Sequence, residues 1–149
     1  MLVWENVKPS HRLKVWAAIA IRAASNEVDN VRPGGMAATI AAVHEDMLEG
    51  TTIDLGYFRD EPVAVVSYDC SLVTVHVLEH VRKHQLEQVA LNYAVNQARA
   101  NGYYTFGLFC ENEELYKFAL QMGFQRPGDE DDYRDELLWF ESEKDEVRI

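Results

Sequence analysis

The chain has few of the residues that define several common protein classes. Its two cysteines, Cys70 and Cys110, lie forty residues apart and form neither a disulfide framework nor a Cys-x-x-Cys metal motif. No apolar run approaches the roughly eighteen residues of a membrane-spanning helix, and the first residues lack the charged-then-apolar layout of a secretory signal. We therefore expect a reduced, cytoplasmic protein in which both cysteines are small buried side chains.

Basic side chains are also scarce, because 14 Lys and Arg face 25 Asp and Glu, for a net charge of −11. Residues 129–149 hold ten of the acidic and three of the basic side chains, a net of −7. Binding of nucleic-acid phosphates needs clustered cations, so we predict no nucleic-acid partner. The acidic segment has two interpretations: a solvated terminus that aids solubility, or a docking surface for a basic protein partner.

The 149 residues, 48% of them apolar, are expected to form one domain over 1–149. A strand is predicted at 2–7, followed by two helices at 10–24 and 36–50. Ser10 is the expected N-cap of the first helix. Its expected inner face consists of residues at three- and four-residue steps: Leu13, Trp16, Ala17, Ala20 and Ala24. Gly50 is expected just beyond the end of the second helix.

The middle of the chain changes to the period of strands. A hairpin is predicted from strands 52–58 and 63–68 around the turn residues between them, followed by a strand at 71–78. A long helix is predicted at 83–102, ended by Gly102. Its expected inner face is Leu86, Val89, Ala90, Tyr93, Ala94 and Ala98.

A strand at 103–110, a short helix at 112–124 and a strand at 135–143 complete the prediction, with a possible extra strand near 124–127. The predicted fold is α+β, a mixed and mostly antiparallel sheet flanked by helices. The order is β-α-α-β-β-β-α-β-α-β.

The last helix carries a specific spacing. Asn112, its expected N-cap, is followed eleven and twelve residues later by Gly123 and Phe124. With the strand–helix–strand order before it, this pattern resembles the GCN5-related N-acetyltransferase (GNAT) family over nearly the whole chain. The resemblance implies that acetyl-CoA would lie between the fourth and fifth strands, with its pyrophosphate at the N-terminus of the following helix.

The resemblance also implies a phosphate-binding turn. The family's pattern is Arg or Gln, two residues, Gly, one residue, then Gly or Ala, and in this chain it falls on residues 82–87. Gln85 and Glu87 occupy the two small positions. We expect the Gln85 side chain to hinder phosphate approach and Glu87 to repel it. The candidate cofactor-binding residues are Leu78, Arg82, Lys83, His84, Gln85, Leu86, Glu87 and Asn112.

Candidate catalytic residues are few. The family often has a Tyr seven residues after the Asn as general acid for the departing thiolate, and Ala119 occupies that position. Tyr116 lies about one helical turn earlier and is a weak substitute. Glu79 and Glu111, each at the end of a predicted strand, are candidate general bases for an amine.

Three histidines, His76, His80 and His84, recur at every fourth position. Two histidines at this spacing on one helix can bind a metal. However, His76 falls in a predicted strand, and the turn into the helix is expected near residues 79–83. The three imidazoles are therefore not expected to share a face, and we predict no metal site.

Three functions remain open. The first is a catalytically degenerate protein that acts by binding, structural or regulatory. It resembles the small proteins of this fold among the internal virion proteins of T7-like phages, which would place it in the host cytoplasm or the virion. The second is an acetyl-CoA-dependent N-acetyltransferase acting on a small amine or a basic protein, and the third is an acidic decoy of a basic partner. The missing small residues favour the first, with acetyl-CoA bound weakly or not at all. We expect a protein partner, possible homo-oligomers and no membrane span.

Overall fold

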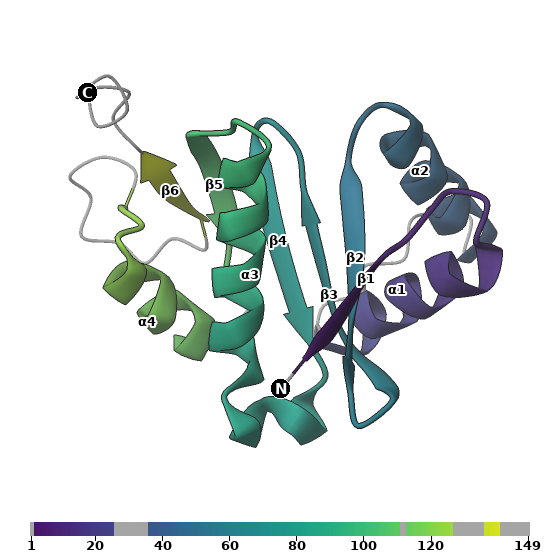
Figure 1. Ribbon diagram of the computed structural model, residues 1–149, viewed down its shortest axis with the longest axis horizontal. Helices are drawn as coiled ribbons and strands as arrows, with labels where there is room; N and C mark the ends of the chain where they lie inside the picture. Colours follow the sequence, from purple (N-terminus) through teal and green to yellow (C-terminus); the bar gives the residue numbers. More distant parts are fainter. Residues whose placement is uncertain (1, 26–35, 111–112, 127–135, 141–149) are drawn as a thin grey trace.

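The computed structural model describes residues 2–25, 36–110, 113–126 and 136–140. In these residues six strands form one sheet in the order β1-β2-β3-β4-β5-β6 (Figure 1). The strands are β1 (Val3–Asn6), β2 (Thr52–Phe58), β3 (Glu61–Tyr68), β4 (Leu72–Val77), β5 (Thr105–Phe109) and β6 (Glu136–Phe140). Neighbouring strands are antiparallel except β4 and β5, which are parallel. The predicted mixed, mostly antiparallel sheet is confirmed.

The helices flank this sheet in the predicted order. They are α1 (Arg12–Ser25), α2 (Met36–Leu48), α3 (Leu86–Ala100) and α4 (Glu113–Met122), with a short 3₁₀ helix, η1 (Glu79–His84), before α3. One core joins α3 and α4 to the sheet through residues such as Leu91, Leu108 and Leu115. The other joins α1 and α2 to Ile53, Leu55 and the opposite face of the sheet. Helices therefore cover both faces.

The predicted inner face of α1 is largely wrong, although Ala17 does pack against the core. The buried residues include Val15, Ala18, Ile19 and Ile21, whereas Leu13 is 86% exposed and Trp16 is 50% exposed. Apolar residues occur all round this helix, so the period alone is compatible with either face. The predicted inner face of α3 is partly wrong for the same kind of reason. The observed buried face includes Glu87, Leu91 and Val95, which were not predicted, while the predicted Val89 is exposed.

Gly50 (φ 115°) and Gly102 (φ 86°), the glycines predicted at helix ends, adopt positive φ angles. Gly123 (φ 118°), which the prediction placed inside the last helix, does the same just after α4. After α4, the Gly123 N–H donates to the Leu120 carbonyl and the Phe124 N–H donates to the Ala119 carbonyl. This is the Schellman arrangement, and it inserts the Phe124 ring into the core. The Gly-Phe pair in the sequence therefore ends α4 and anchors it.

Several boundaries differ from the prediction. Helix α1 begins at Arg12, so Ser10 lies one residue too early to be its N-cap. The extra strand near 124–127 reduces to a single bridge residue, Gln125. Cys110 is buried as expected, but Cys70 is exposed in the β3–β4 turn. Most of the acidic segment 129–149 lies outside the described residues, as does Asn112. None of the described helices is long and apolar enough to cross a membrane.

Candidate functional site

Strands β4 and β5 pair over a short stretch only. Their register contains two residue pairs, Leu72↔Gly107 and Val73↔Leu108, and the Gly107 N–H donates to the Ser71 carbonyl at 2.8 Å. Both strands continue further, β4 to Val77 and β5 to Phe109. We call the strand ends beyond the last pair, residues 74–77 and Phe109, the β4–β5 fork. This is the one parallel pair of strands in the described sheet, and its pairing ends before the two strands do.

Backbone groups of β4 are directed into the fork. The Leu78 N–H donates to the Val63 carbonyl at 2.9 Å, which fixes the even-numbered residues as the ones that bond to β3. The odd-numbered Val75 therefore directs its N–H and C=O groups to the β5 side, past the last β4–β5 pair. An extended ligand with amide groups is suited to such an edge, because it can add as a further strand.

The chain leaves the fork through η1 and turns at Gln85 into α3. Gln85 occupies the N-cap of α3 in the left-handed conformation (φ 61°, ψ 28°), and its side chain makes no capping hydrogen bond. Glycine adopts this conformation without the steric cost that a side chain brings. The sequence-based prediction missed this feature. The turn has the backbone that favours glycine although the residue is glutamine.

Helix α3 begins later than expected. The prediction started it at residue 83, but η1 runs to His84 and the helix begins at Leu86. The Val89 N–H donates to the Gln85 carbonyl at 3.4 Å, so the N–H groups before Val89 lie at the positive end of the helix. This end adjoins the fork through η1 and offers a favourable position for an anion.

Glu87 is a buried residue of α3. It is 3% exposed and lies in line with Leu91, Ala94 and Ala98. Its carboxylate is therefore not displayed to solvent at the turn, and its repulsion of a phosphate stays a prediction. Gln85, by contrast, is exposed at the turn as expected.

Most of the other candidate site residues follow the C-terminal end of β4. Leu78 is half-buried and contacts both cores. Glu79 is exposed at the first residue of η1, directly beyond β4. Arg82, Lys83 and His84 lie in η1, and their side chains belong to the part of the chain that is not described, as do Glu111 and Asn112.

The predicted acid position gives no proton donor. Ala119 is fully buried, and Tyr116 is buried in α4 with the Arg126 guanidinium 5.7 Å from its ring centroid. Both residues pack into the core shared by α3 and α4. Tyr116 is consequently a core aromatic in this structure.

A buried carboxylate that the sequence did not single out lies on β2. Asp54 is 2% exposed, accepts a hydrogen bond from the Tyr93 hydroxyl at 2.6 Å and accepts another from the Asn6 amide at 2.9 Å. The Tyr93 ring stacks on Trp4 with centroids 4.1 Å apart. These contacts tie the edge strand β1 and its neighbour β2 to α3. Alternation along β2 would have placed Asp54 on one face, but its helical partner required the tertiary structure.

This cluster shifts the pKa of two tyrosines. Burial raises the pKa of Tyr93 far above its ordinary value, and the hydrogen bond to the Asp54 carboxylate raises it further. Burial also raises the pKa of Tyr68 to about 12, with a smaller contribution from the charge of Asp54. Both hydroxyls therefore stay neutral under ordinary conditions, and the Tyr93 hydroxyl donates its hydrogen bond to Asp54.

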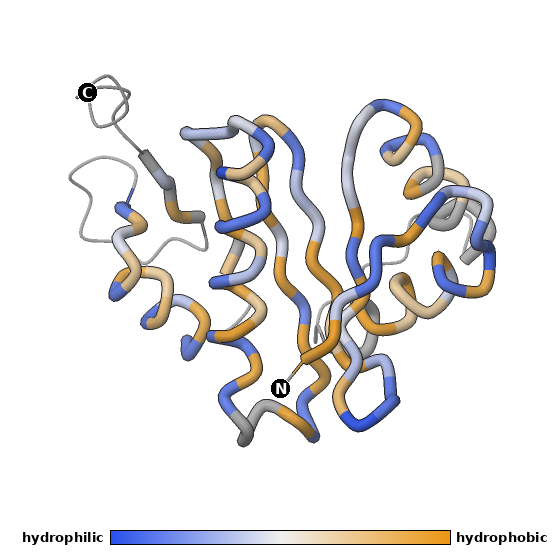
Figure 2. Tube along the Cα trace, viewed as in Figure 1, coloured by the Kyte–Doolittle hydropathy of each residue, from blue (hydrophilic) through white to orange (hydrophobic). Residues whose placement is uncertain are grey.

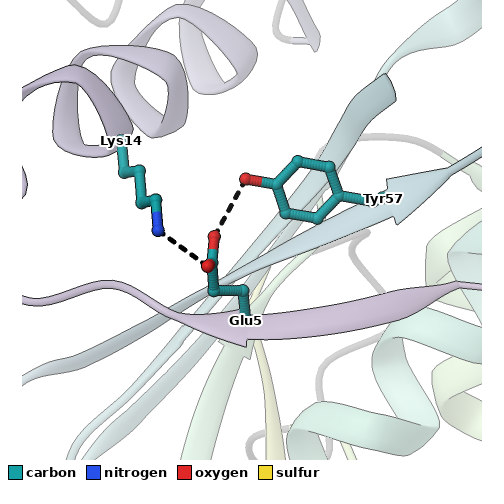
Figure 3. A network of polar contacts seen from close by, with 3 residues as sticks. All are labelled: Glu5, Lys14 and Tyr57. Carbon is teal, nitrogen blue, oxygen red and sulfur yellow. Dashed lines mark hydrogen bonds and ion pairs between the residues drawn. The ribbon is translucent and has the colours of Figure 1, made fainter. Parts of the chain in front are cut away.

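A second polar network lies on the opposite face of β1 and is more exposed (Figure 3). The Glu5 carboxylate accepts from the Lys14 ammonium at 2.7 Å and from the Tyr57 hydroxyl at 3.0 Å. The bond from Lys14 lowers the pKa of Glu5, and burial followed by the bond to Glu5 raises the pKa of Tyr57. This network links α1 to β1 and β2.

The histidine series spans two elements. His76 lies in β4, buried on the strand face opposite Val75, while His80 and His84 lie in η1. Among the described residues, no three His, Cys, Asp or Glu side chains come together in a way that could hold a metal ion.

No sequence-family model and no curated protein sequence matches the chain. Solved structures do match. An N-acetyltransferase from Staphylococcus aureus Mu50 is 15% identical, with 93% of this chain and 96% of that chain covered and a TM-score of 0.65. A ribosomal-protein-alanine N-acetyltransferase from Brucella melitensis is 14% identical, with 93% of this chain and 96% of that chain covered and a TM-score of 0.65. A GNAT superfamily phosphinothricin acetyltransferase from Sinorhizobium meliloti, in complex with AcCoA, is 12% identical. The match covers 92% of this chain and 85% of that chain, with a TM-score of 0.64.

The chain has the GNAT fold. At these identities the likeness concerns the GNAT architecture alone, and the residues of the site must be judged by their own geometry. Three features are relevant to that judgement: the β4–β5 fork, the left-handed Gln85 and the buried Glu87.

Proposed function

We propose that this chain binds a coenzyme A thioester at the β4–β5 fork and transfers the acyl group to an amine. The observation that carries the proposal is the early end of the β4–β5 ladder after Val73↔Leu108. The amide groups of a pantetheine arm can add to the exposed edge of β4 as a strand would. The N-terminus of α3 then lies on the phosphate side of the fork.

The shape of the turn supports binding more than the sequence indicated. The Glu87 side chain lies on the buried face of α3, so it does not occupy the solvent-exposed side of the turn. The left-handed backbone at Gln85 also retains the shape of a glycine turn.

The chemistry requires a base more than an acid. The amine attacks the thioester carbonyl, a C–N bond forms, the C–S bond breaks and the thiolate leaves. The amine proton must be removed, and Glu79 is an exposed carboxylate directly beyond β4. The leaving thiolate takes its proton from solvent in this proposal, because Ala119 has no hydroxyl and Tyr116 is in the core.

A second candidate function is a catalytically silent protein of the same fold that acts by binding, in a structural or regulatory role. Ala119 and the exposed Gln85 side chain at the turn favour it. An association with a phage virion remains a prediction from the resemblance described above.

Calorimetric titration of acetyl-CoA, followed by an assay of thiol release with polyamines and Lys-rich peptides, separates the two candidates. We expect binding, and thiol release that depends on the amine. Gln85→Glu should weaken acetyl-CoA binding by about tenfold or more, because it places a carboxylate at the turn. Gln121→Glu, the same change at an exposed position of α4, should have no effect. Binding without thiol release would favour the silent protein, and absence of binding would refute the coenzyme A proposal.

A further inference from the structure

Helix α1 is apolar on the side that faces solvent. Leu13 is 86% exposed and Trp16 is 50% exposed, and Ala20, one turn further on, is exposed too. The opposite side, with Val15 and Ile19, is in the core. In Figure 2 the coloured part of α1 is blue near its start and mostly pale to orange after it. A helix that is apolar all round is typically covered on both sides.

The exposed apolar residues of α1 lie beside cations. Lys8, His11 and Arg12 are exposed just before and at the start of the helix, and residues 6–25 contain no Asp or Glu. We call Lys8, His11, Arg12, Leu13 and Trp16 the α1 surface. It combines positive charge with exposed apolar area in a chain whose net charge is −11.

The end of α2 has the opposite charge and a similar apolar centre. Leu48 is 68% exposed, and Glu45, Asp46 and Glu49 around it are exposed as well. We call these four residues the α2 surface. Helices α1 and α2 contact one another, so both surfaces belong to the same helical layer of the molecule.

We propose that these two surfaces form a homodimer interface, in which the α1 surface of one copy binds the α2 surface of a second copy and the reverse contact forms at the same time. A two-fold axis produces this reciprocity, because each copy contributes both surfaces. Leu13, Trp16 and Leu48 form the apolar centre, and the cations and carboxylates around them pair across it.

The charge distribution favours a second copy over other occupants. A nucleic acid or an anionic membrane would meet the carboxylates of the α2 surface next to the cations of the α1 surface, so part of the contact would be repulsive. A second copy presents each charge with its opposite.

Sedimentation equilibrium over a roughly hundredfold range of protein concentration tests the proposal directly. We expect a reversible monomer–dimer equilibrium of the wild-type chain. The double substitution Leu13→Ser, Trp16→Ser should weaken dimerisation at least about tenfold. Val89→Ser removes an exposed apolar side chain on the other face of the sheet, where Val89 is 42% exposed, and should leave the equilibrium unchanged. Circular dichroism verifies that each variant folds.

A charge-reversal experiment tests the reciprocal geometry. Arg12→Glu and Glu45→Arg should each weaken dimerisation alone, because each brings like charges together. Mixing the two variants should restore dimers of mixed composition, since one of the two contacts regains opposite charges and the other is native. A wild-type chain that is monomeric at all concentrations would overturn the proposal. So would dimers that survive the Leu13 and Trp16 substitutions, or reversed variants that do not recover on mixing.

Discussion

The hydrogen bond from Tyr93 to the buried Asp54 carboxylate should make a large contribution to stability. Tyr93→Phe keeps the ring and its stacking on Trp4 but removes the hydroxyl that donates to Asp54 at 2.6 Å. The carboxylate is 2% exposed, so water cannot replace the donor, and the Asn6 amide remains as a donor to the other oxygen. Hydrogen bonds to charged groups contribute about 1.5–3 kcal/mol, and a poorly compensated buried charge adds to the loss.

We therefore expect Tyr93→Phe to lower the free energy of unfolding by about 2–3 kcal/mol, or the melting temperature by about 4–12 °C. Urea unfolding followed by circular dichroism measures the change. Tyr57→Phe is the matched control, because Tyr57 also donates to a carboxylate, but Glu5 is exposed to solvent. This control should cost clearly less than Tyr93→Phe, because water can replace the donor at Glu5.

A double-mutant cycle isolates the contribution of the Asp54 charge to the hydrogen bond with Tyr93. With Asp54→Asn already present, Tyr93→Phe should cost only about 1 kcal/mol, the contribution of a neutral hydrogen bond. If Tyr93→Phe and Tyr57→Phe destabilise the protein equally, the argument from burial of Asp54 is wrong.

Three further predictions concern single positions. Gln85→Gly should raise the free energy of unfolding by up to about 1 kcal/mol in urea unfolding, because φ is 61° there, whereas Gln88→Gly inside α3 should lower it by a similar amount. The indole N–H of Trp139 is buried and has no hydrogen-bond acceptor among the described residues, so Trp139→Phe should change the melting temperature by no more than a few degrees; a larger loss would reveal an acceptor. The raised pKa of Tyr68, about 12, and of Tyr93 stabilises the native state below pH 10, and this contribution is lost as the pH rises through 10 towards 12. A pH series of urea unfolding should show that fall, and Tyr68→Phe should make it less steep.

The order of strands and helices could be predicted from the sequence, and so could the glycines that end α2 and α3. Gly50 and Gly102 mark helix ends by a backbone conformation that few other residues adopt, so the signal is local. The side chains that face the core were harder to predict. Leu13 and Trp16 follow a helical period as well as Val15 and Ile19 do, and contact with the sheet selects the second pair.

The candidate site was less predictable because it depends on conformation rather than composition. The residue type of Glu87 indicates an exposed charge, yet its place in line with Ala94 and Ala98 directs it inward. Gln85 gives no sequence signal for a left-handed turn. The fork between β4 and β5 depends on where a ladder between distant segments ends, which residue periodicity does not encode.

The alternation of backbone groups along β4 has a consequence for amide hydrogen exchange. The His76 amide lies inside the β3–β4 ladder, so its exchange requires that ladder to open. The amide of its neighbour Val75 is directed into the fork and can exchange without opening the ladder. Two adjacent residues of one strand should therefore report different events, one the opening of the sheet and the other occupancy of the fork. A ligand that adds as a strand would slow exchange at Val75 and leave His76 almost unchanged.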